Sequence, residues 1–193
     1  MAPDTRDATE KTASIIPGTV NRIGTADFSD MRTVHDILRK SEDECIQLPY
    51  EVNTTVTRNG TIWRVFGTTG GFVNPFLIPD DLTGSYSYHN HPEAKTNYSF
   101  SAEDVAFLFR SKSEYMKASD HLFEYELKRT KMTVDKSPEW VYHRFKEISK
   151  SADIRRLLWD GLIDPDMDVY HETMIYLSKE LKINYVRRKK KTC

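Results

Sequence analysis

The chain has 193 residues, a length that suits one domain with additional segments, and its 28 basic residues nearly balance 29 acidic ones. This balance argues against a nucleic-acid-binding protein, and the presence of only two cysteines excludes a disulfide scaffold or a cysteine-based zinc finger. No apolar run approaches the roughly 18 residues of a membrane span, and the polar N-terminus lacks the apolar segment of a secretory signal. We therefore expect a cytoplasmic protein without a membrane partner.

The chain begins with a polar segment and then becomes patterned. Residues 1–28 contain scattered Thr, Asp and Gly and predict a flexible N-terminal arm. Ser29 or Asp30 can cap a following helix whose apolar residues recur at helical spacing. We expect this helix to end before Pro49, because the residue before a proline avoids the helical conformation.

Alternating sequences after this helix predict strands. Residues 51–57 and 61–66 flank Asn59-Gly60, a dipeptide typical of tight hairpin turns. Residues 85–89 predict a further strand, which leads directly into a segment containing two histidines.

The order of the remaining elements completes the predicted architecture. A helix from Ser101 to about Ser113 precedes two paired strands at 115–118 and 122–127. Residues 29–132 therefore predict an α/β core.

The C-terminal part of the chain changes to a helical pattern. Pro138 suits the first position of a helix, and residues 133–186 predict a helical extension. The run Arg187 to Lys191 carries five positive charges at the chain end, without an apolar anchor. It is typical of a nucleic-acid or anionic-surface contact, or of a solubilising end, and we interpret residues 187–193 as a basic disordered tail.

One motif carries chemistry. His89 and His91 are two residues apart on an extended strand end, so their rings point to the same side, and Asp104 in the next helix can supply a third ligand. Two imidazoles, a carboxylate and a water form an open catalytic Zn²⁺ site. Glu51 is then a candidate general base, and Ser101 a candidate donor to a developing oxyanion.

Simpler interpretations of the same residues stay open. A serine followed three residues later by an aspartate, as in Ser101 and Asp104, is also an ordinary helix start. A histidine pair two residues apart also occurs by chance in polar loops. Asp120-His121 can be a hydrogen-bond partner of the metal ligands or a surface turn. We reject His171-Glu172 as a ligand pair, because adjacent helical residues point about 100° apart.

The sequence His89-Asn90-His91-Pro92, followed by Phe100 to Val105 and preceded by Glu51, resembles the JAMM/MPN (JAB) metalloprotease superfamily. The resemblance covers roughly residues 33 to 130 and is closest to the RadC branch and to JAB-like domains of phage structural proteins and bacterial polymorphic toxins.

This resemblance implies a fold and a set of roles. The fold would be a mixed sheet flanked by helices, similar to that of cytidine deaminases, and here it would carry the helical C-terminal extension. His89, His91 and Asp104 would bind zinc, Glu51 would be the base, and Ser101 would steady the tetrahedral intermediate. The substrate would be a protein or peptide, cleaved at a peptide or isopeptide bond.

The spacing departs from the family pattern at one place. Nine residues separate His91 from Ser101, whereas the pattern has seven, which would select Ser99. We favour Ser101, since Asp104 follows it at the required position whereas Ala102 follows Ser99.

Two further questions stay open. Glu44, near the end of the preceding helix, is the second candidate for the base. The alternative functions are a catalytically inactive binding or assembly module of phage or toxin origin, and a nuclease-type effector.

Overall fold

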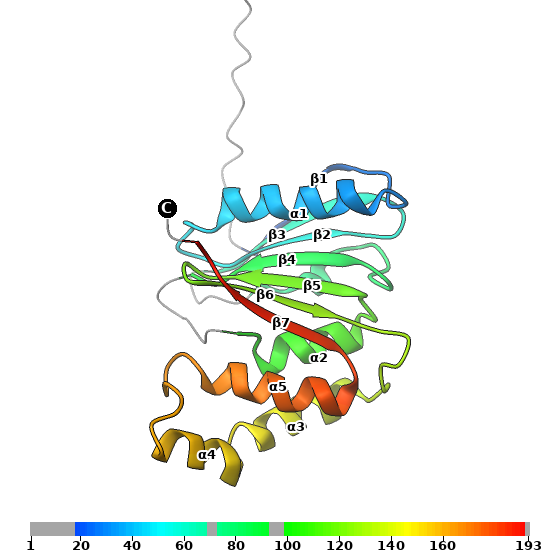
Figure 1. Ribbon diagram of the computed structural model, residues 1–193. Helices are drawn as coiled ribbons and strands as arrows, with labels where there is room; N and C mark the ends of the chain where they lie inside the picture. The colour runs from blue at the N-terminus through cyan, green and yellow to red at the C-terminus, as the bar shows by residue number, and fades with distance from the viewer. Residues whose placement is uncertain (1–17, 69–72, 93–98, 192–193) are drawn as a thin grey trace, which may run out of the picture.

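The computed structural model describes residues 18–68, 73–92 and 99–191 (Figure 1). Within this part, seven strands form one sheet in the order β1-β3-β2-β4-β5-β6-β7. The strands are β1 (Val20–Thr25), β2 (Val52–Val56), β3 (Thr61–Phe66), β4 (Tyr86–Asn90), β5 (Tyr115–Ser119), β6 (Phe123–Lys128) and β7 (Asn184–Lys189). The helices are α1 (Met31–Cys45), the 3₁₀ turn η1 (Pro75–Leu77), α2 (Ala102–Arg110), α3 (Pro138–Ile148), α4 (Ala152–Trp159) and α5 (Val169–Leu181). The predicted α/β class is confirmed.

The sheet is mixed. β4 and β5 run parallel and are connected through α2, whereas the other neighbouring pairs are antiparallel. β4 pairs with β2 on one side and β5 on the other, so its end is buried inside the sheet. This central position makes the end of β4 a rigid place for functional side chains.

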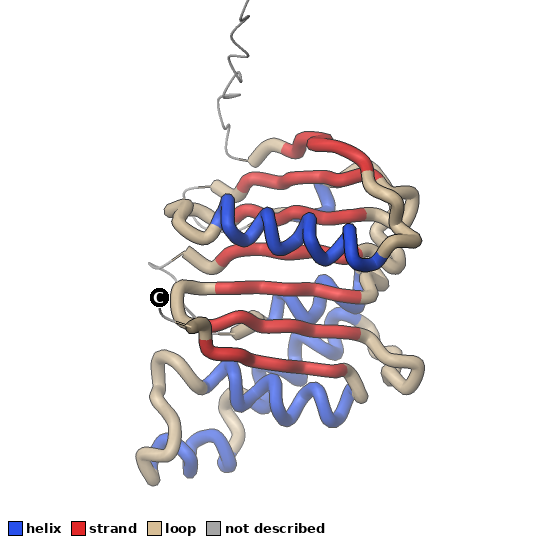
Figure 2. Tube along the Cα trace, turned by 45° about the horizontal axis from the view of Figure 1, so that its top comes forward, coloured by secondary structure: helices blue, strands red, loops and turns tan. Residues whose placement is uncertain are grey.

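Helices cover both faces of the sheet. α1 lies across β2 and β4 on one face, whereas α2, α3 and α5 lie on the other (Figures 1 and 2). Two hydrophobic clusters result, one on each face. None of the helices in the described ranges is long and apolar enough to cross a membrane.

The local signals that predicted the first helix and the hairpin are confirmed. The Asp30 side chain accepts hydrogen bonds from the backbone N–H groups of Arg32 and Thr33, and α1 ends at Cys45, before Pro49. Gly60 has φ of 86°, and a Cβ at this position would lie 2.2 Å from the carbonyl oxygen of Ala26. The hairpin turn therefore requires a glycine here.

The predicted flexible arm over residues 1–28 is wrong in its last part. Val20 to Thr25 form β1, which pairs with β3 at the sheet edge. The segment has little apolar alternation of its own, so the backbone ladder to β3 orders it. Residues 1–17 lie outside the described residues.

The predicted disordered tail over residues 187–193 is also wrong where the structure describes it. β7 pairs with β6 through Lys189, and the Lys190 N–H donates to the carbonyl of Leu122. Arg187 pairs with Asp168 at 2.8 Å, and Lys190 pairs with Glu42 at 2.7 Å. Acidic partners from other elements thus hold the basic run in place; residues 192 and 193 lie outside the described residues.

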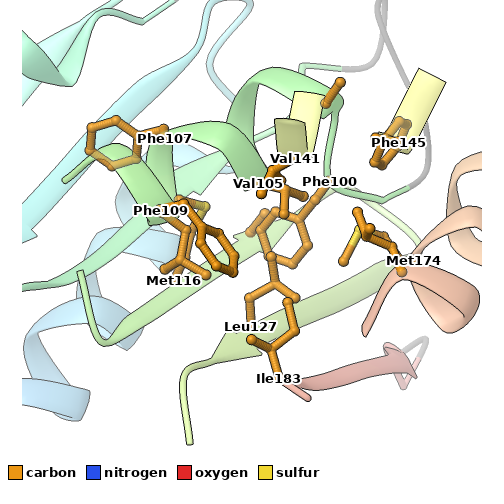
Figure 3. Packing of buried hydrophobic residues seen from close by; sticks show 14 of the residues in the cluster. Phe100, Val105, Phe107, Phe109, Met116, Leu127, Val141, Phe145, Met174 and Ile183 are labelled. Atoms are coloured by element: carbon orange, nitrogen blue, oxygen red, sulfur yellow. The ribbon is translucent and has the colours of Figure 1, made fainter. Parts of the chain in front are cut away.

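The predicted helical extension completes the core of the predicted 29–132 unit. Phe145 of α3 and Met174 of α5 belong to the same buried cluster as Phe100 and Leu127 (Figure 3). Ile183, just before β7, reaches this cluster as well. The two predicted segments therefore share one hydrophobic core.

Candidate metal centre

The end of β4 presents two histidines to one cavity. His89 lies within β4, and His91 follows the last residue of that strand. The His91 N–H donates to the carbonyl oxygen of Ser119 at 2.7 Å, which continues the pairing with β5 beyond the strand end. This contact fixes the backbone that carries both rings.

The two histidines and Asp104 form a compact group of possible metal ligands. Their ligand atoms all lie within 4.8 Å of one another. His89 Nε2 is 3.0 Å from His91 Nε2 and 3.6 Å from Asp104 Oδ1. Tetrahedral zinc bound at about 2.0–2.2 Å would place neighbouring ligand atoms roughly 3.3–3.6 Å apart. The His89–Asp104 distance of 3.6 Å lies at the upper end of this range and the His89–His91 distance of 3.0 Å is a little shorter, so these residues could hold such an ion.

Both imidazoles are held in the form that binds metals. Burial lowers the pKa of His89, although the nearby Asp104 opposes this shift. Burial and then the proximity of His89 lower the pKa of His91 to about 4. Neutral rings at pH 7 offer a nitrogen lone pair to a cation.

A capping box at the start of α2 positions Asp104. Its Oδ2 accepts hydrogen bonds from the backbone N–H of Ser101 at 2.8 Å and from the Ser101 hydroxyl at 2.7 Å. The Asp104 N–H donates in return to Ser101 Oγ. Asp104 therefore keeps Oδ1 for His89 and the cavity. In this geometry the hydroxyl hydrogen of Ser101 is directed at Asp104, so its predicted oxyanion role stays a prediction.

Glu51 shares the cavity with these ligands, whereas Glu44 does not. Glu51 Oε1 lies 4.0 Å from His89 Nε2, and its Oε2 accepts a hydrogen bond from the Val73 N–H at 3.3 Å. Glu44 instead pairs with Arg64 at 2.7 Å and is absent from the cavity lining. Of the two predicted candidates for the base, geometry favours Glu51.

Asn90, the residue between the two histidines, was not among the predicted site residues. Its side chain is fully buried, accepts from the Val52 N–H at 2.7 Å and donates to the Tyr50 carbonyl at 3.1 Å. It thus fixes the backbone on both sides of Glu51. An amide inside an otherwise polar motif was the available signal, but its partners lie about 40 residues away and leave no local pattern.

The cavity in front of the ligands has a volume of about 490 Å³. Besides the predicted residues, it is lined by Phe76, Phe107 and Tyr142, which come from η1, α2 and α3. Ser99 also lines it, although its hydroxyl is bonded to Tyr185 at 2.9 Å. These aromatic residues were not predicted as site residues, because they come from three separate elements that no local sequence pattern joins.

The remaining predicted pairs lie outside the ligand group. Asp120 is buried and accepts from the backbone of Leu122 and Phe123 and from the Tyr125 hydroxyl, so it acts on His91 only through its charge. His171 Nδ1 lies 2.7 Å from the Tyr185 hydroxyl oxygen and is not among the three possible ligands grouped in the described residues.

Comparison with known proteins adds no relative. No family model matches the chain, and no curated protein and no solved structure is significantly similar to it. The resemblance to the JAMM/MPN superfamily therefore depends on the motif.

Proposed function

We propose that this chain is a zinc-dependent hydrolase that cleaves a peptide or isopeptide bond by the JAMM type of mechanism. The observation that carries the proposal is the convergence of three possible ligands, His89, His91 and Asp104, with the carboxylate of Glu51 in one cavity. Two imidazoles, one carboxylate and an accessible fourth side suit Zn²⁺ in a catalytic site.

Each residue has a distinct task in this proposal. Zinc would lower the pKa of a water molecule and polarise the substrate carbonyl. Glu51 accepts the proton of the attacking water, whose oxygen bonds to the carbonyl carbon, and returns this proton to the leaving nitrogen as the C–N bond breaks. Ser101 keeps Asp104 oriented through the capping box. Asn90 keeps Glu51 in place through its two backbone hydrogen bonds.

The first prediction concerns Glu51→Gln, with Glu44→Gln as the matched control. Glutamine keeps the shape of Glu51 but cannot accept the proton, so turnover should fall by about 10²–10⁴ while zinc content and melting temperature are retained. Glu44→Gln should keep turnover, because Glu44 lies outside the cavity. Metal analysis, thermal melting and cleavage of a peptide and isopeptide panel measure these outcomes.

A third variant links metal and activity. Asp104→Ala removes one of three protein ligands, and both zinc content and turnover should be lost. Full activity of Glu51→Gln would contradict the proposed base. Zinc binding without cleavage of any panel member would favour the inactive binding module over the hydrolase.

A further inference from the structure

The cavity carries an aromatic wall, made of Phe76, Phe107 and Tyr142. The rings of Phe76 and Phe107 meet edge to face, with centroids 5.0 Å apart at 67°. Phe107 is 9% exposed and belongs to the core, whereas Phe76 is 47% exposed. Core packing therefore explains Phe107 but leaves a large apolar surface of Phe76 open to the cavity, and such surfaces mark binding sites when they line a pocket.

The wall begins one helical turn from the metal ligands. Asp104 and Phe107 are three residues apart and share one face of α2, so Phe107 lies about 4.5 Å further along the helix axis. An extended peptide advances about 3.3 Å per residue. When a substrate amide is held at the ligands, the side chain of the next residue can therefore reach the wall.

Hydrogen bonds also connect the wall to the proposed base. The N–H of Val73 donates to Glu51 Oε2 at 3.3 Å, and the chain then enters η1, where Asn74 Oδ1 accepts from the Phe76 N–H at 3.2 Å. Phe76 is therefore oriented relative to Glu51 by two successive hydrogen bonds. A side chain bound against Phe76 would share that orientation.

Among the described residues, the far end of the wall offers no unmatched positive charge. Arg110 lies one turn beyond Phe107, 5.8 Å from the Phe76 ring centroid, and pairs with Glu139 of α3 at 3.0 Å. Because Glu139 neutralises this cation, the pair gives little advantage to an acidic side chain. The contacts at the wall itself are apolar and aromatic.

We infer that the substrate carries a large apolar side chain, preferably aromatic, on the residue next to the cleaved amide, and that the aromatic wall binds it. This inference rests on the proposed function for the position of the amide. The driving force is the removal of the exposed Phe76 ring and of the substrate side chain from water.

A binding experiment with the metal-free full-length chain tests the wall without turnover. N-acetyl-L-phenylalaninamide and N-acetylglycinamide are titrated into the protein by NMR, with Phe76→Ala and Leu77→Ala as the paired variants. Leu77 is the matched control, since it lies in the same turn, is 42% exposed and does not line the cavity. Wild type and Leu77→Ala should bind the phenylalanine amide at least about tenfold more tightly than the glycine amide. Phe76→Ala should lose most of this preference.

The same comparison with zinc separates the two proposals. N-acetyl-phenylalanine hydroxamate and N-acetyl-glycine hydroxamate are titrated into zinc-loaded wild type and variants by calorimetry. Zinc-dependent binding of both with equal affinity would overturn the aromatic wall and leave the hydrolase standing. A preference for the phenylalanine amide in protein that takes up no zinc would support the wall and overturn the metal centre. Phe107→Leu keeps an apolar residue in the core and should lower the preference for the phenylalanine compound in part. It tests the wall even if Phe76→Ala fails to fold.

Discussion

Asn90 gives the proposed base its position, and this makes it the most informative single residue outside the ligand group. Its amide is buried and accepts from one backbone neighbour of Glu51 while donating to the other. A substitution of Asn90 should therefore displace Glu51 while the three possible metal ligands keep their side chains.

The second prediction concerns Asn90→Ala and Asn90→Asp. Alanine leaves the buried N–H of Val52 and the half-buried carbonyl of Tyr50 without their partner, which should cost about 1–3 kcal/mol of unfolding free energy. Turnover should fall more than zinc affinity, because the change displaces Glu51. Aspartate can still accept from Val52, but it places an unpaired charge at a fully buried position facing the Tyr50 carbonyl, so it should destabilise at least as much as alanine. Urea denaturation and metal analysis measure both effects, and unchanged stability of the alanine variant would refute the role.

The third prediction concerns pH and His171. Burial, followed by the charge of Arg187, lowers the pKa of His171 to about 4, although Asp168 opposes the shift. An unfolded chain binds this proton near pH 6.5, so stability should fall as the pH decreases from about 6.5 toward 4. His171→Asn, which can still bond to Tyr185, should lose part of this dependence.

The measurement is the denaturation midpoint between pH 4 and 8 for the wild type and His171→Asn. An identical slope in His171→Asn and wild type would contradict the assigned origin.

At the scale of the element, local signals predicted more than non-local ones. Asp30 caps α1 through bonds to residues two and three positions away, and Asn59-Gly60 defines its hairpin within four residues, so both were readable from the sequence. β1 and β7 are instead ordered by strands distant in the chain. The same holds within the site: His89, His91 and Asp104 form a short motif, whereas the aromatic wall combines three separate elements.

β7 shows why a basic run can be mistaken for a solvated end. The basic residues of β7 and of Lys190 just after it form ion pairs with acidic residues elsewhere in the fold. These partners are Asp168 before α5, Glu126 on β6 and Glu42 on α1. Glu42 is only 6% exposed and also pairs with Lys117, and these lysines lower its pKa against the effect of burial. No local sequence pattern contains these partners, so composition alone favours disorder.

The fourth prediction concerns truncation of β7. Removing residues 187–193 deletes half of the β6–β7 ladder, leaves Asp168 without Arg187, and leaves Glu42 with Lys117 in place of two basic partners. We expect a loss of several kcal/mol of unfolding free energy, since leaving buried or half-buried charges unpaired is costly. Removing only residues 192–193 serves as the control and should change stability little. Equal melting temperatures of the two truncated chains would show that residues 187–191 contribute nothing to stability.

At the scale of the molecule, the sheet separates two hydrophobic clusters, and the cavity that holds the possible metal ligands opens on the face covered by α2 and α3. The C-terminal helices contribute to this cavity, because Tyr142 and Glu139 of α3 line it. The sequence predicted these helices but not their position on the sheet. A helical period indicates which residues are buried, but it does not indicate which other elements they pack against. The predicted boundary at residue 133 therefore runs through one continuous core.

The last prediction follows from this shared core. If α3 and α5 fold together with the sheet, the most protected amides of β3 and of α5 should exchange with the same opening free energy in native-state hydrogen exchange. Phe145→Ala empties a fully buried site in the shared cluster and should lower both values together, by about 3–5 kcal/mol. Tyr176→Ala on the exposed side of α5 should lower neither by more than about 0.5 kcal/mol. A variant in which α5 loses protection while β3 keeps it would show that the C-terminal helices form a separately folding unit, and the part of the cavity lined by α3 would then depend on their docking.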